Sequence, residues 1–285
     1  MLIESQRQPR PEENAVDSGI AAPLQKWLRL FPSLLLAQLV LVDSVLDAQA
    51  GETSADGEAA SGWEFSISPY LWAAGISGRS GTLPGLPPAD VDESFSDIWD
   101  DLRFAGMIVG TAHKGRFGIA GDLQYIKTEA EDNDLAPIFG SEKLTSKTFI
   151  LSVVGEYIAF EEGRSNFIVS AGARLWSVET TLDLSSGLLP GRTIKGDDTW
   201  IDPILGVRGN VDVVSDVFLT GWGFVGGFGV GSDIMADLFG GVGYRFTDSI
   251  STTIGYRWMK VDRDEDDFLY DVRQQGPIAG LTFRF

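Results

Sequence analysis

From position 63 to the C-terminus, hydrophobic and polar residues alternate in segments of strand length. In the last segment, 277–285, every odd position is apolar, and every even position except Ile278 is glycine or polar. Side chains of a β-strand point alternately to two faces, so this pattern predicts a strand with one apolar and one polar face. The pattern predicts ten strands, at 63–71, 102–113, 117–125, 148–157, 167–176, 201–208, 218–228, 234–246, 250–258 and 277–285. The segment 218–228 is rich in glycine, and its parity leaves its facing open.

The connections between these segments alternate in length. Short ones are expected at 114–115, 161–165, 211–215 and 247–249, and long ones at 77–101, 129–143, 184–198 and 261–273; only 229–233 breaks the rule. Short turns at one end and long loops at the other are typical of bacterial outer-membrane barrels. The sequence therefore predicts an all-β fold, a closed antiparallel transmembrane β-barrel of about ten strands at 63–285. Eight strands are the alternative, if the glycine-rich segment and its partner fold over the mouth.

The N-terminal region resembles a secretory signal. Lys26 and Arg29 precede an apolar core at 30–42, and the small residues Ala48 and Ala50 follow it. The core is shorter than the ~20 apolar residues of a spanning helix. We expect residues 1–50 to be an upstream extension plus signal peptide with cleavage after Ala50, and 51–62 to be a flexible leader. This route leads through the periplasm to the outer membrane of a Gram-negative bacterium.

Aromatic residues gather on the apolar faces beside the short turns and the chain ends. We expect a periplasmic girdle made of Trp63, Phe65, Phe117, Tyr157, Phe167, Tyr244, Phe246, Phe283 and Phe285. Tyr125, Tyr256 and Trp258 would contribute to an outer girdle. Phe283 and Phe285 also provide the aromatic end with which outer-membrane barrels commonly finish.

The opposite faces carry charges, which we expect to line the lumen as a network. Its members are Glu64, Arg103, Asp122, Glu156, Arg174, Asp202, Arg208, Asp237, Arg245, Arg257 and Arg284. Strand direction places Asp122, Arg174 and Arg257 near the middle, and Arg103, Asp202 and Asp237 toward the outside. Pairing of the first strand with the last predicts a bridge between Glu64 and Arg284. The tripeptide Gly-x-Arg recurs at 172–174, 206–208, 243–245 and 255–257, and we expect each glycine to leave room for a neighbouring guanidinium.

Two functions fit such a lumen. The charges fill a barrel of structural or surface-interaction type, or they line a narrow ion or small-solute channel, which is a porin-like role. Barrels of about eight strands are filled by side chains, whereas open porins use 16–18 strands. Ten strands lie near the filled limit, so we favour the filled barrel and keep the channel as the alternative.

Three motifs suggest other chemistry but lack its context. The stretch 221–226 spells G-x-G-x-x-G inside a predicted strand with no following helix, so it does not indicate a nucleotide site. His113 is the only histidine and belongs to the predicted periplasmic rim, where we expect it to be solvated. The acidic stretch 262–267 lacks the glycine and the final glutamate of an EF-hand. We therefore expect no enzyme activity, no catalytic residue, no cofactor and no dedicated metal site.

Charge narrows the range of partners. The net charge of −19 excludes nucleic acid as a natural partner, while the acidic loops suit weak capture of divalent cations. Membrane lipid, lipopolysaccharide and the barrel-assembly machinery are the expected partners. The chain contains no cysteine, so neither a disulfide nor a thiolate site is available.

Several stretches are similar to a group of poorly characterised proteobacterial outer-membrane β-barrel proteins. They are 172–176, 202–208, 226–233, 255–257 and the closing Arg284-Phe285. The resemblance covers most of 63–285 and implies a membrane barrel, but it brings no catalytic or ligand residue. Phe224 departs from it, because the group is expected to have a polar residue there.

Overall fold

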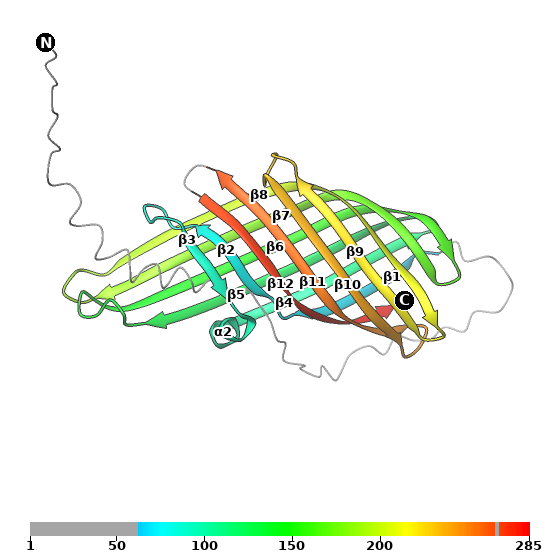
Figure 1. The fold of residues 1–285 in the computed structure, drawn as a ribbon, viewed down its shortest axis with the longest axis horizontal. Helices are drawn as coiled ribbons and strands as arrows, with labels where there is room; N and C mark the ends of the chain where they lie inside the picture. The colour runs from blue at the N-terminus through cyan, green and yellow to red at the C-terminus, as the bar shows by residue number, and fades with distance from the viewer. Residues whose placement is uncertain (1–61, 266–267) are drawn as a thin grey trace, which may run out of the picture.

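The computed structural model describes residues 62–265 and 268–285, so the expected signal peptide and nearly all of the leader lie outside the described residues. The chain is built almost entirely of strands (Figure 1). They are β1 (Glu64–Trp72), β2 (Gly75–Gly81), β3 (Ala89–Glu93), β4 (Leu102–Lys114), β5 (Phe117–Asp132), β6 (Phe139–Glu162), β7 (Ser165–Ser186), β8 (Arg192–Val214), β9 (Val217–Gly227), β10 (Ile234–Arg245), β11 (Ile250–Glu265) and β12 (Phe268–Arg284). One short helix, α2 (Phe95–Asp101), precedes β4.

Ten strands close into an antiparallel barrel in the order β1-β4-β5-β6-β7-β8-β9-β10-β11-β12. The seam is the pairing of β1 with β12, in which Ser66 lies opposite Arg284 and Tyr70 opposite Gly280. The predicted fold class is confirmed, and the eight-strand alternative is wrong because β9 and β10 are full members of the wall. Among the described residues, no helix is long and apolar enough to cross a membrane.

We call the end that holds both barrel termini the short-turn end and the opposite end the tall end. At the short-turn end the strands are joined by tight connections such as Gly115-Arg116 and Gly163-Arg164. Gly115 and Gly163 adopt φ values of 58° and 61°, which glycine takes without a steric penalty. The short connections of the sequence prediction are confirmed there.

The outer face near the short-turn end is an apolar band, and strand β6 shows its limits. Leu151, Val153 and Tyr157 point outward in this band. Except for the half-buried Phe283, the predicted girdle residues here are exposed, as in the ring pair of Phe117 and Tyr157. A barrel surface that is apolar outside and polar inside is the arrangement that a bilayer requires.

Toward the tall end, the outward face of the same strands becomes charged. Lys143 and Lys147 of β6 point outward there, while Leu144 and Ile150 are buried inside. The four strands β5–β8 continue as a projecting wall, far past the low turn between β9 and β10 (Figure 1).

A second wall, made of β11, β12, β2 and β3, faces the first across the tall end. Trp200 of β8 packs its ring against Phe268 and Tyr270 of β12, at centroid distances of 6.0 and 6.3 Å. Since β8 and β12 are not neighbours in the sheet, these contacts cross the interior. The tall end is therefore filled by a hydrophobic core between two walls.

The sequence prediction of four long loops is wrong. The stretches 129–143, 184–198 and 261–273 are largely strand, and their connections shrink to 133–138, 187–191 and 266–267. Many of their charges face outward, although Glu142 is buried and Arg263 lies over the Trp200 ring. Their composition is therefore loop-like although their backbone is paired. The expectation at 77–101 is wrong for a related reason, because β2, β3 and α2 occupy much of it.

The hairpin of β2 and β3 closes the mouth at the tall end. β2 continues the line of β1 along β12, and the chain then turns inward. Leu83 is buried in the core, and the Thr82 hydroxyl donates a hydrogen bond to Oγ1 of Thr180 on β7, at 3.0 Å. The hairpin tip therefore reaches the inner face of the opposite wall.

Candidate functional site

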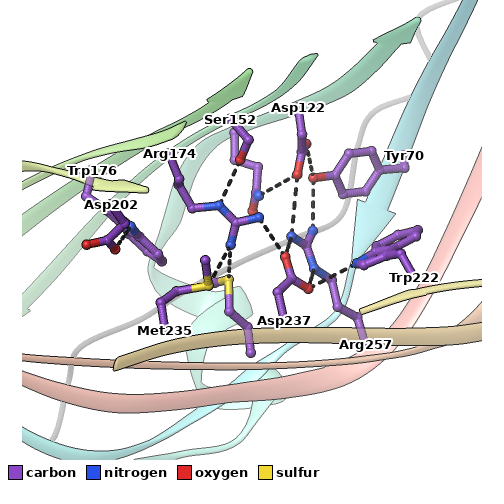
Figure 2. Close-up of polar contacts among 12 residues, drawn as sticks. Tyr70, Asp122, Ser152, Arg174, Trp176, Asp202, Trp222, Met235, Asp237 and Arg257 are labelled. Carbon is purple, nitrogen blue, oxygen red and sulfur yellow. Dashed lines mark hydrogen bonds and ion pairs between the residues drawn. The ribbon is translucent and has the colours of Figure 1, made fainter. Parts of the chain in front are cut away.

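A group of buried charges fills the middle of the lumen and is centred on Asp237 of β10 (Figure 2). Arg257 of β11 donates from Nε and Nη2 to the two carboxylate oxygens of Asp237, at 3.0 and 2.7 Å. Arg174 of β7 reaches the same carboxylate from the other side, with its Nη2 2.8 Å from Oδ2. One anion thus holds two guanidinium groups, and charge-assisted bonds of this kind are stronger than neutral ones.

A second carboxylate, Asp122 of β5, lies next to Arg257. Its Oδ2 is 3.4 Å from Nη2 of Arg257 and accepts from the Gln124 amide at 3.1 Å. The Tyr70 hydroxyl donates to Asp122 at 2.7 Å and accepts from Arg257 at 3.1 Å. We call Tyr70, Asp122, Arg174, Asp237 and Arg257 the central network.

Aromatic rings and thioethers surround the two guanidinium groups. The Arg257 guanidinium lies between the rings of Trp72 and Trp222, 4.6 and 5.5 Å from their centroids. The Trp222 indole also donates to Asp237 at 3.2 Å. Arg174 lies against two methionine sulfur atoms, and its Nε donates to Ser152 at 2.8 Å. Rings over a desolvated cation add favourable interaction with its charge.

The central network blocks the lumen at its own level. Arg174 and Arg257 are 2% and 1% exposed, and Asp237 and Trp72 are fully buried. Side chains that lined an open aqueous path would be accessible to water. The described structure therefore has a filled lumen here rather than an open one.

Asp202 on β8 is also fully buried, but it belongs to a different group. It accepts from the Trp176 indole at 2.9 Å and from the Ser232 backbone N–H at 2.6 Å and hydroxyl at 2.9 Å. No described Lys, Arg or His lies within 4.0 Å of it as an ion-pair partner. Asp202 therefore acts as a clamp that holds the β9–β10 turn against β8.

Toward the short-turn end, Glu156 of β6 gathers a second ion-pair group. Arg208 approaches it to 2.7 Å and His113 to 2.9 Å. The expectation that His113 is solvated is wrong, since its side chain is only 14% exposed and packs above Gly118. Arg245 pairs instead with Asp212 at 2.7 Å and lies over the Phe218 ring.

Three expectations for the lumen charges need correction. Arg103 points outward, because the β4–β5 register shifts between Leu102 and Phe104 and turns it toward Glu129, 3.3 Å away. Asp237 lies in the central layer rather than nearer the outside. Glu64 and Arg284 lie beside the seam, but no ion pair within 4.0 Å joins them. The seam is confirmed, and the bridge across it is wrong.

The role expected for the Gly-x-Arg glycines is also wrong, because aromatic rings fill the space at three of them. A Cβ on Gly206 would lie 2.2 Å from the ring of Phe224, and one on Gly243 would lie 2.1 Å from that of Phe218. A Cβ on Gly255 would lie 2.5 Å from the ring of Phe239 and 2.4 Å from the backbone oxygen of Gly240. These contacts also settle the facing of β9, whose residues Phe218 and Phe224 point inward. Gly172 is different, since a Cβ there would meet the backbone oxygen of Val153.

The sequence prediction missed Tyr70 of the central network and two residues that hydrogen-bond to the network, Gln124 and Trp222. Tyr70 and Trp72 continue the inward parity of Glu64, Ser66 and Ser68, so the alternation contained that signal. Trp222 gave no such signal, because it lies in the glycine-rich strand. Within the described ranges, no group of three or more His, Cys, Asp or Glu side chains is placed to hold a metal ion.

Comparison with known proteins finds distant likenesses among solved structures. The sequence matches no protein-family model and no curated protein sequence. Among solved structures, the chain is similar to the outer membrane protease OmpT from Escherichia coli, with 11% identity and a TM-score of 0.47 over 79% of this chain and 98% of that one. It is also similar to Ail of Yersinia pestis, with 12% identity and a TM-score of 0.35 over 78% and 99% of the two chains. A major outer membrane protein from Thermus thermophilus gives 13% identity and a TM-score of 0.35 over 79% and 100%. At these values, no activity is carried over.

Proposed function

We propose that this chain is an integral outer-membrane β-barrel that works through its surface, in a structural or surface-interaction role, and does not conduct solutes. The observation that carries the proposal is the central network, a layer of buried side chains across the lumen. The apolar band with its girdle aromatics supports membrane insertion, because only a bilayer makes such an outer face favourable. In this orientation the short-turn end is periplasmic and the tall end is extracellular.

The extracellular part supports a surface role. Its two walls enclose a hydrophobic core, and the β2–β3 hairpin closes their mouth, so the lumen is obstructed at two levels. The paired strands of β5–β8 hold a rigid surface well outside the band. We assign no catalytic residue and no cofactor, and we take membrane lipid and the assembly machinery as the partners of such a barrel.

Single-channel recording in planar bilayers tests the proposal. The purified barrel is expected to give no discrete openings, and a variant that lacks the hairpin tip at 82–88 is expected to remain closed, because the central network lies beneath it. Reproducible conductance steps from the unaltered protein would contradict the proposal.

A narrow ion channel is the second candidate, and the polarity of the buried layer favours it. A lumen filled for structural reasons alone does not need charges, whereas an ion path does. If steps are seen, their ion selectivity should change in Asp122→Asn, which removes a charge beside Arg257. Unchanged selectivity would assign the steps to a contaminant or to leakage around the barrel.

A further inference from the structure

The outward face of β4, β5 and β6 carries a group of basic side chains immediately outside the apolar band. Glu129 lies at its centre, 3.3 Å from Nε of Arg103, 2.7 Å from Nζ of Lys127 and 3.1 Å from Nζ of Lys143. One carboxylate therefore meets three cations, and the second carboxylate near Lys143, Glu131, is 3.5 Å away. Arg103, Lys127, Lys143 and Lys147 have three carboxylates within 4.0 Å, those of Glu129, Glu131 and Glu179. These side chains together carry one net positive charge on a chain whose net charge is −19.

The local backbone places Arg103 in this group. By parity Arg103 belongs to the lumen, and only the register shift between Leu102 and Phe104 turns it outward. Irregularities of this kind redirect a side chain and disrupt the ladder locally.

Two of the lysines face each other directly. Lys127 of β5 and Lys147 of β6 are Cα partners, one outward pair beyond Tyr125 and Phe149. Like charges directly opposite on a sheet repel each other. Lys147 is balanced by Glu179 at 2.7 Å, but Glu179 also serves Lys195 at 2.9 Å. Each of the two facing lysines thus depends on a carboxylate that it shares with at least one other cation.

The four cations are more exposed than Glu129, although Glu131 beside Lys143 is 65% exposed. The side chains of Arg103, Lys127, Lys143 and Lys147 are 48%, 33%, 37% and 40% exposed, whereas that of Glu129 is 16% exposed. Hydrogen bonds from Lys127 and Lys143 lower the pKa of Glu129 to about 2, so the anion at the centre stays ionised. An approaching ligand meets these ammonium and guanidinium groups before it meets the Glu129 carboxylate.

We propose that Arg103, Lys127, Lys143 and Lys147 form a docking surface for the phosphate groups of a phosphorylated glycolipid in the outer leaflet. The inference rests on the proposed function, since it requires the band to lie in the outer membrane. The adjoining rings of Phe104 and Tyr125, 5.8 Å apart, mark the interface depth at which lipid headgroups lie. Clusters of basic side chains at that depth attract anionic headgroups.

The opposite wall offers a matched surface without an excess of positive charge. On β11 and β12, Lys260 is paired with Asp271, and Asp262 and Asp264 add further carboxylates beside it. A pair of substitutions there removes two cations at a similar distance from the band. This pair is the control for the pair on β5 and β6.

The test is native mass spectrometry of the mature barrel, purified in detergent and titrated with bisphosphorylated lipid A and with its dephosphorylated form. We expect the unaltered protein and Lys260→Gln/Arg273→Gln to retain the phosphorylated lipid equally. Lys127→Gln/Lys147→Gln should weaken retention by roughly thirtyfold, the order expected for two lost headgroup contacts. The dephosphorylated lipid should bind all three proteins equally weakly.

Two results would overturn the inference. One is equal retention by the two double variants, and the other is displacement of the lipid by excess inorganic phosphate, which would identify a site for free anions. Heat-modifiable gel migration checks that each variant is folded. Cell fractionation separates a failure of the lipid inference from a failure of the proposed function. A chain that is absent from the outer membrane would refute the proposed function whatever lipid it binds.

Discussion

Arg257 and Asp237 lie diagonally on adjacent strands and share two hydrogen bonds, at 3.0 and 2.7 Å. Arg174 donates to the same carboxylate, with its Nη2 2.8 Å from Oδ2. Asp237 is thus the anion common to two buried cations. Breaking a buried pair by removing one partner is costly, since the other partner is left without compensation.

The first prediction concerns this shared anion. Asp237→Asn should lower the free energy of unfolding of the detergent-folded barrel by about 3–5 kcal/mol, because two guanidinium groups lose their counter-charge. Arg174→Met should cost less, since Arg257 still satisfies the carboxylate. Urea titration followed by tryptophan fluorescence measures both, with Lys260→Gln on the outer face as the control. If Arg174→Met proved the more damaging of the two, Asp237 would not be the centre of the network.

The second prediction concerns the glycines that face aromatic rings. Gly206→Ala should destabilise the barrel by about 1–3 kcal/mol, because its Cβ would overlap the Phe224 ring in an already packed lumen. The second-site change Phe224→Leu should restore part of the loss. Gly240→Ala is the matched control, since nothing lies within 4 Å of a Cβ at that position. The same unfolding assay applies, and an equal cost at positions 206 and 240 would refute the steric account.

The third prediction concerns pH. The pKa of Glu129 falls from its ordinary value of 4.5 to about 2, mainly through hydrogen bonds from Lys127 and Lys143. A lowered carboxyl pKa stabilises the folded state above pH 4.5, and this contribution is lost as the pH falls toward 2. Unfolding measured across this window should therefore show a steeper acid loss in the unaltered protein than in Glu129→Gln. Parallel profiles would mean that Glu129 titrates alike in the folded and unfolded chains.

The fourth prediction concerns the hairpin across the mouth. The chain has no cysteine, so Thr82→Cys/Thr180→Cys introduces the only thiols, at positions whose hydroxyl oxygens are 3.0 Å apart. A short thiol cross-linker should join them in whole cells and change the migration of the unfolded chain on a gel. Thr82→Cys/Thr181→Cys should remain uncoupled, because residue 181 points out of the wall. Efficient coupling of the control pair would place the hairpin outside the lumen.

The fifth prediction concerns the clamp at Asp202. Asp202→Ala removes the acceptor of two hydrogen bonds from Ser232 and one from Trp176. Amide hydrogen exchange should then rise in the turn at 228–233 while the central network stays protected. Faster exchange throughout β8 and β10 would instead assign Asp202 to the stability of the whole barrel.

The alternation of apolar and polar residues predicted the ten barrel strands and the closure, because a period of two is a direct consequence of strand geometry. It failed where the solvent outside the barrel changes. At Lys143 and Lys147 the outward face meets water, so the charges that belong to a strand there look like those of a loop. A prediction that allows the outward face to change from apolar to charged within one strand would have assigned much of the tall end to strands.

Other misses have local causes. Arg103 has the correct parity for the lumen, and only an irregular ladder position turns it outward, which spacing cannot reveal. Asp237 was placed too far outside because strands of a barrel are tilted, so residues at different distances from their turns meet at one level. Tyr70 shows the opposite case, since its facing was predictable and only its role was not.

The change of polarity along β5–β8 has a consequence for how accurately these strands must pair. A slip of one residue exchanges the two faces of a strand along its whole length. Within the band, the slip would turn Ser152 toward lipid. Beyond the band, the same slip would expose Leu144 to water and bury Lys143 between the walls. A one-residue slip is therefore unfavourable along the whole strand, because it places polar groups against lipid inside the band and apolar groups against water beyond it.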